Sequence, residues 1–347
     1  MNTPVPGTGG DIYVPFEERS GECSVVYFTR DLSPAGLKNI YDRVCAPLSG
    51  NVAIKTHTGE AMGPNFIPVA WTKELFAEKL PDSTVIETNT YYDGSRYTTE
   101  EHRKTLEING WDFCPVDIID DEGVATLPIE GGKWLTEAHV GEGLLKYDSM
   151  LTLTHFKGHV TGGFGGSNKN IGIGCADGRI GKAEIHTIAG SDEQWSIKKE
   201  EFMERMTETT KAVLDFFDNR VTYINVMRNM SVNCDCDGVT AEPVVTPDIG
   251  ILASTDILAV DNACVDMIYA LPEGGGDALI ERIRSRHGLR QLSYMKELGM
   301  GNERYVLIDI DNDDCETTAK EVTKDIEPEW TPDCFNVFFG RNKRRPE

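Results

Sequence analysis

Two features that would direct the protein to or across a membrane are missing from the sequence. No apolar run approaches the roughly 20 residues that a helix needs to span a bilayer. The first residues also lack the basic and apolar segments of a secretory signal peptide. We therefore expect a cytoplasmic protein without a membrane partner.

Positive charge is scarce. The 347 residues include 34 Lys and Arg against 57 Asp and Glu, which gives a formal net charge of −23. Nucleic acids and anionic membrane surfaces attract basic proteins, so neither is an expected partner. Against this background, a local group of cations indicates a site for a small anionic molecule.

Cysteines in the CxxC spacing are also missing, and the nine cysteines are an odd number. The odd count, without a compact framework of cysteines, argues against a disulfide-stapled scaffold. The missing CxxC excludes ferredoxin clusters of the usual spacing. We expect reduced thiols.

What the sequence does contain is a regular alternation of short apolar strands and helical segments. This alternation predicts an α/β fold with a mainly parallel sheet flanked by helices, arranged as one body or as two α/β lobes. The expected segments are a loose N-terminal arm (1–20), a first lobe (21–148), a second lobe with the glycine-rich stretch and the Cys-Asp-Cys motif (149–312), and a peripheral C-terminal tail (313–347).

The glycine-rich stretch from Leu151 to His186 is the most unusual part of the chain. Seven glycines lie between Gly158 and Gly174, among several His and Lys residues, and we expect a long functional loop there. Glycines free backbone N–H groups to face an anion, and a lysine supplies charge. The expected anion-binding residues are Gly165, Gly166, Asn168, Lys169 and, from another strand end, Asn89. A tight irregular turn is the alternative.

Polar clusters follow directly after several predicted strands. In parallel sheets, ligands bind beyond the carboxyl ends of the strands, so these clusters are expected to meet on one rim. The clusters are Lys55/His57/Glu60, Asn89, His155/Lys157/His159 and Cys234/Cys236.

Imidazole and thiol side chains on this rim indicate a metal centre. The expected ligands of a divalent transition metal or an iron–sulfur cluster are His57, His155, His159, Cys234 and Cys236. Two cysteines two residues apart on an extended chain point to the same side, which turns Asp235 the other way. Structural histidines and a plain strand end are the alternatives, and a role for Cys175 stays open.

The chain also resembles a known family in several blocks. They are VAIKTHTGE (52–60), ETNTYYDGSRYTTEEH (87–102), LTHFKGHVTGGFGGSNKNIGIGCADGRIGKAEIH (153–186), YINVMRNMSVNCDCDG (223–238), DIGILASTDILAVDNACVDMI (248–268) and LGMGNERYVLI (298–308). These blocks resemble the domain-of-unknown-function family 362. Many of its members are described as iron–sulfur proteins because of an inserted ferredoxin module, which this chain lacks. The block HFKGHVTGGFGGSNKNI is also similar to the lactate racemase family, in which a lysine at the position of Lys169 holds a nickel pincer nucleotide.

Together these features favour an enzyme that acts on a small anionic molecule and carries a metal or iron–sulfur centre. Lys55, Lys157 and His159 are the expected catalytic residues, because His and a desolvated Lys can act as acid or base. One alternative is a non-catalytic metal or electron-transfer protein that serves a redox partner. The other, implied by the second resemblance, is a racemase-like activity on a hydroxy acid.

Overall fold

A computed structural model describes residues 12–327 of the chain. One nine-stranded sheet forms its centre, in the order β13-β12-β1-β11-β10-β7-β2-β3-β4. The strands are β1 (Cys23–Thr29), β2 (Val52–Lys55), β3 (Thr84–Glu87), β4 (Val116–Ile118), β5 (Val124–Pro128), β6 (Glu137–Gly141), β7 (Ser149–His155), β8 (Lys157–His159), β9 (Gly163–Gly165), β10 (Val221–Met227), β11 (Gly250–Ser254), β12 (Arg304–Asp309) and β13 (Cys315–Thr317).

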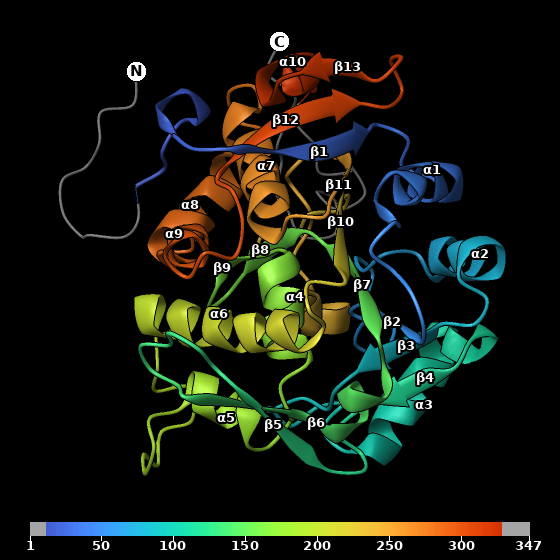
Figure 1. Ribbon diagram of the computed structural model, residues 1–347, viewed down its shortest axis with the longest axis vertical. Helices are drawn as coiled ribbons and strands as arrows, with labels where there is room; N and C mark the ends of the chain where they lie inside the picture. The colour runs from blue at the N-terminus through green and yellow to red at the C-terminus, as the bar shows by residue number, and fades with distance from the viewer. Residues whose placement is uncertain (1–11, 328–347) are drawn as a thin grey trace, which may run out of the picture.

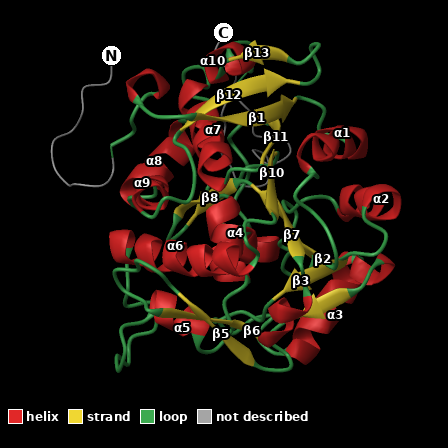
Figure 2. Cartoon of the chain, in the orientation of Figure 1, coloured by secondary structure: helices red, strands yellow, loops and turns green. Residues whose placement is uncertain are grey.

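Helices cover both faces of this sheet (Figures 1 and 2). They are α1 (Pro34–Val44), α2 (Val69–Lys79), α3 (Thr99–Asn109), α4 (Ser167–Gly174), α5 (Gly181–His186), α6 (Lys199–Phe216), α7 (Ile257–Ala270), α8 (Asp277–Ser285), α9 (Arg290–Glu297) and α10 (Ala319–Thr323). Short 3-10 helices are η1 (Phe16–Glu18), η2 (Trp111–Phe113), η3 (Glu142–Lys146) and η4 (Asp235–Thr240).

The sheet is mainly parallel, as the alternation predicts. The run from β10 through β7, β2 and β3 to β4 is parallel throughout, whereas β11 pairs antiparallel with both of its neighbours. The α/β fold class is confirmed. Strands from both expected lobes share this sheet, and the division of the chain at residue 148 stays a prediction about domains.

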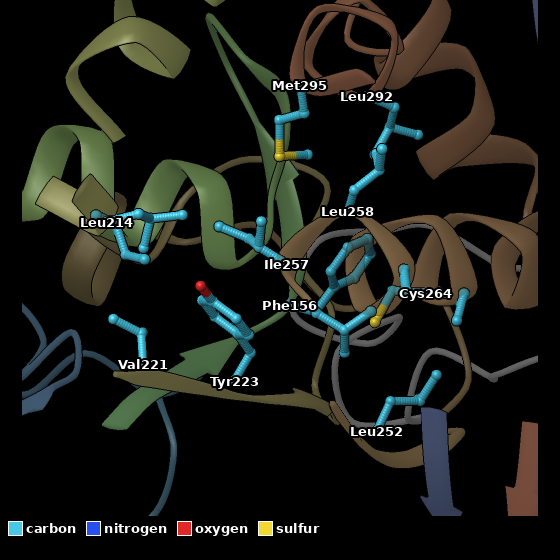
Figure 3. Packing of buried hydrophobic residues seen from close by; sticks show 14 of the residues in the cluster. Phe156, Leu214, Val221, Tyr223, Leu252, Ile257, Leu258, Cys264, Leu292 and Met295 are labelled. Atoms are coloured by element: carbon cyan, nitrogen blue, oxygen red, sulfur yellow. The ribbon is translucent and has the colours of Figure 1, made fainter. Parts of the chain in front are cut away.

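Buried strand residues alternate between two hydrophobic cores, one on each face of the sheet. Ile251 and Leu151 pack on the face covered by α1 and α2, while their neighbours Leu252 and Met150 pack on the other. Figure 3 shows the second core, where Leu252, Tyr223 and Val221 of the sheet lie beneath α7. Two buried faces explain why these strands are apolar throughout rather than alternating with polar residues.

The two ends of the described region pack against helix α7 and the edge of the sheet. Tyr13 and Arg19 of the expected loose arm both donate hydrogen bonds to buried Asp266, with the Tyr13 hydroxyl 2.8 Å from Oδ1. At the other end, β13 extends the sheet beside β12, and α10 packs against α7. Residues 1–11 and 328–347 of the expected arm and tail lie outside the described residues.

The glycine-rich stretch is not the long loop that the sequence predicts. It contains the end of β7, the hairpin β8–β9 and the helices α4 and α5. Its glycines allow close approach of backbone segments: a Cβ on Gly158 would lie 2.0 Å from the carbonyl oxygen of Val232. The prediction was wrong because glycine density was taken as a sign of irregular backbone, although here it marks tight packing.

Candidate functional site

A cavity of about 480 Å³ opens where the predicted strand-end clusters meet. The end of β2 contributes Lys55 and His57, and the end of β7 contributes His155. Because β10, β7 and β2 are adjacent and parallel, their carboxyl ends share one edge of the sheet. Cys234, in the segment that follows β10, therefore reaches the same cavity. The predicted convergence of His57, His155 and Cys234 is what the structure shows.

The cavity wall is rich in cations for so acidic a protein. Five cationic side chains line it, against two carboxylates: Lys55, Arg96, Lys157, Lys169 and Lys182, against Glu87 and Asp237. Most of the cations have internal partners, so each must be considered separately before it is given a role toward a ligand.

Lys55 is held by Glu87 of the neighbouring strand. Its Nζ lies 2.8 Å from Glu87 Oε2 and 3.0 Å from the carbonyl oxygen of Thr56. Arg96 reaches Glu60 at 2.9 Å and Glu87 at 3.3 Å. Burial opposes the charge of Glu87, but Lys55, His57 and Arg96 outweigh it and hold the pKa of this carboxyl well below its ordinary value. Lys55 is thus one member of a buried ion-pair network, which does not suit the predicted role of a free base.

Lys157 and His155 share a second buried carboxylate. Asp235 Oδ2 lies 2.8 Å from His155 Nδ1 and 2.9 Å from Lys157 Nζ. Burial opposes the lysine charge, but Asp235 outweighs it and raises the pKa of Lys157, so this lysine remains a cation. The prediction that Asp235 points away from the site is wrong, because the 3-10 helix η4 begins at this residue and turns the backbone inward.

His155 has no lone pair to offer a metal. Its Nδ1 faces the Asp235 carboxylate, and its Nε2 lies 2.6 Å from the carbonyl oxygen of Arg228. Both partners can only accept, so both ring nitrogens donate, which is the hydrogen-bonding pattern of the protonated ring. The predicted metal-ligand role of His155 does not fit this arrangement.

His159 is fixed in the opposite pattern. Its Nδ1 accepts hydrogen bonds from the backbone N–H groups of Thr161 and Gly162, at 3.2 and 2.8 Å. Burial, with the charges of Lys169 and Lys157, holds the pKa of His159 well below its ordinary value. The neutral ring therefore carries its proton on Nε2, which makes His159 a hydrogen-bond donor rather than a metal ligand or a base.

His186 forms part of an aromatic wall of the cavity. Its ring centroid lies 4.6 Å from that of Trp195 and 5.9 Å from that of Tyr91. Its Nδ1 donates to the carbonyl oxygen of Lys182 at 2.7 Å, and burial lowers the pKa of His186 to about 3. This neutral ring keeps its lone pair on Nε2 and can accept a hydrogen bond.

Lys182 is buried with three acceptors around its amine. Its Nζ donates to Thr88 Oγ1 and to the carbonyl oxygens of Asn89 and Ala176, at 2.5, 2.5 and 3.1 Å. Burial lowers the pKa of Lys182 to about 8. Three acceptors match the three hydrogens of an ammonium group, so Lys182 is charged at neutral pH but already has hydrogen-bond partners.

Lys169 differs from the other four cations. It lies in α4 at the cavity wall and is partly exposed, and it makes no hydrogen bond or ion pair within residues 12–327. Its charge acts on His159, His186 and Cys236, so it lies among the groups that face the cavity. Of the five cations at the cavity wall, Lys169 is therefore the one without a partner among residues 12–327 and available for a ligand.

The first backbone N–H groups of α4, which follow the glycine run, are not available to a ligand. Gly165 and Gly166 line the cavity, but the backbone N–H groups of Ser167 and Asn168 donate to buried Asp261 at 2.8 and 3.0 Å. A Cβ on Gly166 would lie 2.5 Å from Asp261 Oδ1. The helix N-terminus thus already has an anion, an internal carboxylate, and the glycine at 166 makes room for it.

Two predicted anion contacts lie elsewhere. The side-chain amide of Asn168 donates to Thr207 Oγ1 at 2.9 Å, and that of Asn89 donates to Thr99 Oγ1 at 3.0 Å. Neither residue lines the cavity. Cys175 is buried away from it as well, and burial raises the pKa of its thiol to about 12.

The expected metal ligands do not assemble into a metal site. Within residues 12–327, no group of three or more His, Cys, Asp or Glu side chains is placed to hold an ion. His57 keeps a free ring nitrogen, since its buried Nε2 has no partner and its Nδ1 lies 3.5 Å from Glu87. An iron–sulfur cluster is usually held by four cysteines, and of the cysteines within residues 12–327 only Cys234 and Cys236 line the cavity, so these residues do not fit such a cluster.

One family model matches the part of the chain that forms the cavity. The family model described as Domain of unknown function (DUF362) matches residues 52–266, a range that includes all the cavity-lining residues of the described chain. The chain belongs to the DUF362 family. No curated protein matches the sequence.

Two solved structures are similar to this DUF362 protein in fold only. The lactate racemase apoprotein from Thermoanaerobacterium thermosaccharolyticum is 10% identical, with a TM-score of 0.36 over 87% of this chain and 86% of the other. A Thermotoga maritima protein is 12% identical, with a TM-score of 0.33 over 56% of this chain and 49% of the other.

Several residues of the cavity were not among the predicted site residues. Glu87 ends β3 and satisfies the same strand-end rule as Lys55, so that rule could have found it. Lys182 and His186 lie inside the glycine-rich stretch, for which the sequence predicts a loop, so the helix α5 that places both side chains at the cavity was not predicted. Arg96 follows no strand directly, and we find no sequence signal for it.

Proposed function

We propose that this DUF362 protein is an enzyme that acts on a small molecule bearing a carboxylate or phosphate group. The observation that carries the proposal is Lys169, a cation at the wall of a small cavity without a carboxylate partner among residues 12–327. A lone cation in a partly dry site stabilises an anionic ligand more than it stabilises the empty fold.

The surrounding side chains give this cavity the features of a reactive site. The His159 ring is a fixed hydrogen-bond donor and the His186 ring is a fixed acceptor. Tyr91 and Trp195 supply apolar surface beside them. In this proposal Lys169 holds the anionic group, while the two neutral imidazoles orient polar atoms of the ligand.

A metal or iron–sulfur centre has no part in this proposal, because the donor groups on the rim do not fit one. Exchange with a redox partner protein likewise stays a prediction. Lys55 and Lys157 have no acid–base role in this proposal, since buried carboxylates hold both amines. They contribute positive electrostatic potential to the cavity instead.

Racemisation of a hydroxy acid is the second candidate, and one observation favours it. Such a reaction needs a proton acceptor on each side of the reacting carbon. His57 Nε2 has no partner and His186 donates through Nδ1, so Nε2 of both rings keeps a lone pair at one cavity, and burial, which lowers the pKa of His186 to about 3, makes His186 the weaker acceptor.

Binding measurements with Lys169→Met test the first proposal. Calorimetric titration would use inorganic phosphate and short 2-hydroxy carboxylates as probes. Loss of a charge-assisted contact of about 1.5–3 kcal/mol corresponds to roughly 10- to 150-fold weaker binding. The control is Lys104→Met on α3, a lysine that pairs with Glu100 in solvent and does not line the cavity. Equal affinity of wild type and Lys169→Met, or no binding of any probe at millimolar concentration, would refute the proposal.

The racemase candidate needs a separate measurement. Incubation with a single enantiomer of a bound hydroxy acid, followed by chiral chromatography, should show loss of optical purity in wild type. The rate should fall in both His57→Gln and His186→Gln, because each ring serves one face of the substrate. Retention of one enantiomer in wild type would exclude racemisation and leave the binding proposal intact.

A further inference from the structure

The two cysteines of the Cys-Asp-Cys motif have no role in the proposed function, although both line the cavity. Their sulfur atoms lie 2.9 Å apart, and both are free thiols. Cys234 is buried and Cys236 is partly exposed. The more exposed Cys236 thiol is therefore the one that a molecule in the cavity can reach, and the Cys234 thiol lies 2.9 Å from it.

The backbone holds this pair together. The N–H group of Asp237 donates to the carbonyl oxygen of Cys234 at 3.0 Å, which closes a tight turn around the motif. Asp235, between the two cysteines, is fixed by its contacts with His155 and Lys157. The two sulfurs are thus kept close by the fold itself.

The environment separates the two thiols chemically. The hydrogen bond from the Cys234 thiol lowers the pKa of Cys236 well below its ordinary value, despite burial, and the charges of His57 and Lys169 act in the same direction. The same hydrogen bond, together with burial, raises the pKa of Cys234. A thiolate beside a protonated thiol is the arrangement of a nucleophile and a resolving group.

We propose that Cys234 and Cys236 form a redox-active dithiol that exchanges with low-molecular-weight disulfides entering the cavity. A cavity of about 480 Å³ has room for a small disulfide but not for a folded protein domain. The proposal does not depend on anion binding by Lys169.

The exchange takes place in two steps. The Cys236 thiolate attacks one sulfur of the disulfide RSSR, the S–S bond breaks, and RS⁻ leaves, which gives a mixed disulfide between Cys236 and RS. Cys234 then gives its proton to the released thiolate and attacks the sulfur of Cys236, so that a second RS⁻ leaves. The dithiol loses two electrons and becomes the Cys234–Cys236 disulfide, and RSSR gains them and becomes one thiol and one thiolate.

The pH dependence of the first step in the intact wild-type protein is the primary test. Reduced protein is mixed with oxidised glutathione, quenched with an alkylating agent, and assigned by peptide mass spectrometry. Cys23 is the internal control, because it is exposed and free. An ordinary thiol with a pKa near 8.5 should react about tenfold faster per unit of pH between 6 and 8. Cys236 should react at least about tenfold faster than Cys23 at pH 6, with a nearly flat profile.

Single substitutions test the second step. Cys234→Ser should stop at the mixed disulfide, seen as one glutathione bound at Cys236, whereas wild type should give the internal disulfide and release both thiols. Cys236→Ser should abolish fast exchange. Circular dichroism checks that each variant folds. If one variant does not fold, the pH profile of the wild-type protein still tests the first step.

Three outcomes would overturn the proposal. The first is a Cys236 rate no greater than that of Cys23 at pH 6. The second is a stable mixed disulfide in wild type that never resolves to the internal disulfide. The third is one tightly held zinc per chain, lost in both serine variants, without any exchange, which would make the pair a metal site instead.

Discussion

Asp235→Asn is the substitution that most directly tests how this cavity is built. The wild-type carboxylate is buried, and a single oxygen, Oδ2, contacts both His155 Nδ1 and Lys157 Nζ. Asparagine keeps the size of the side chain but removes its charge. His155 and Lys157 would then share one neutral amide oxygen. The amide nitrogen of the new side chain would add a third hydrogen-bond donor beside these two donors.

The expected cost follows from the burial of all three partners. Their side chains are between 1% and 8% exposed, so solvent cannot replace the lost carboxylate. Removing one partner of a buried pair typically costs about 3–5 kcal/mol, because it leaves an uncompensated buried charge. We expect a loss of this order in the free energy of unfolding.

The pH range of the effect follows from the direction of the Asp235 shift. Burial opposes the carboxylate, but His155 and Lys157 outweigh it and hold the pKa of Asp235 well below its ordinary value. A carboxyl group whose pKa is lowered by folding stabilises the fold above its unfolded pKa, about 3.9, and loses that contribution as the pH falls toward the folded value. The difference between wild type and variant should therefore persist from pH 8 down to about pH 5.

Equilibrium unfolding in urea, followed by circular dichroism and tryptophan fluorescence, measures this loss. The matched control is Asp237→Asn, which makes the same change two residues later in the same 3-10 helix, at a partly exposed carboxyl without a buried ion pair. The control should change the free energy of unfolding by no more than about 0.5 kcal/mol. A loss for Asp235→Asn no larger than that of the control would refute the argument from the buried pair.

Two further substitutions test the packing and the protonation of the same region. In Gly174→Ala the new Cβ would lie 2.2 Å from Lys55 Cε, and this side chain cannot move away easily because Glu87 and the Thr56 carbonyl hold its amine. We expect calorimetry to show a free energy of unfolding lower by about 1–3 kcal/mol, and an unchanged melting temperature would contradict this expectation. Burial lowers the pKa of His102 from 6.5 to about 3, so its contribution to stability is present above pH 6.5 and is lost as the pH falls toward 3. Urea unfolding at several pH values between 3 and 6.5 measures how steeply the free energy of unfolding rises with pH. This slope should be smaller in His102→Gln than in wild type by up to about 1.4 kcal/mol per pH unit, and an equal slope in both proteins would contradict a neutral buried ring.

Local signals predict most elements of the sheet and its helices. The apolar run at 84–87 predicts a strand, and the segment 99–109 followed by Gly110 predicts a helix with a glycine C-cap. Strand β3 and helix α3 have these bounds, and Gly110 adopts the left-handed conformation of a C-cap, with φ 83°. Ser33 followed by Pro34 predicts a helix start, and in α1 the Ser33 hydroxyl accepts from the N–H groups of Ala35 and Gly36. These features depend on neighbours within a few residues, so the sequence alone contains them.

The strand-end rule predicts the location of the cavity for a similar reason. It needs only that strands are parallel and adjacent, and β10, β7 and β2 satisfy both conditions. The rule says where side chains gather, but not what each one contacts there. His57, His155 and His159 all reach the cavity, yet they differ in which ring nitrogens remain free.

Sheet order decides which of the cations are available for a ligand, and sheet order is not a local property. Lys55 has a counter-charge because β3 lies next to β2 and ends in Glu87, whereas Lys157 has one because η4 begins at Asp235 and places its carboxylate 2.9 Å from the lysine amine. Lys169 has none among residues 12–327, and Asp261, which lies at the start of its helix, accepts hydrogen bonds from the backbone N–H groups of Ser167 and Asn168 instead. A sequence pattern treats the three lysines alike. Tertiary contacts with buried carboxylates make Lys55 and Lys157 structural cations. Lys169 has no comparable contact within the described part of the chain, and this lysine is therefore the expected binding residue for an anionic ligand.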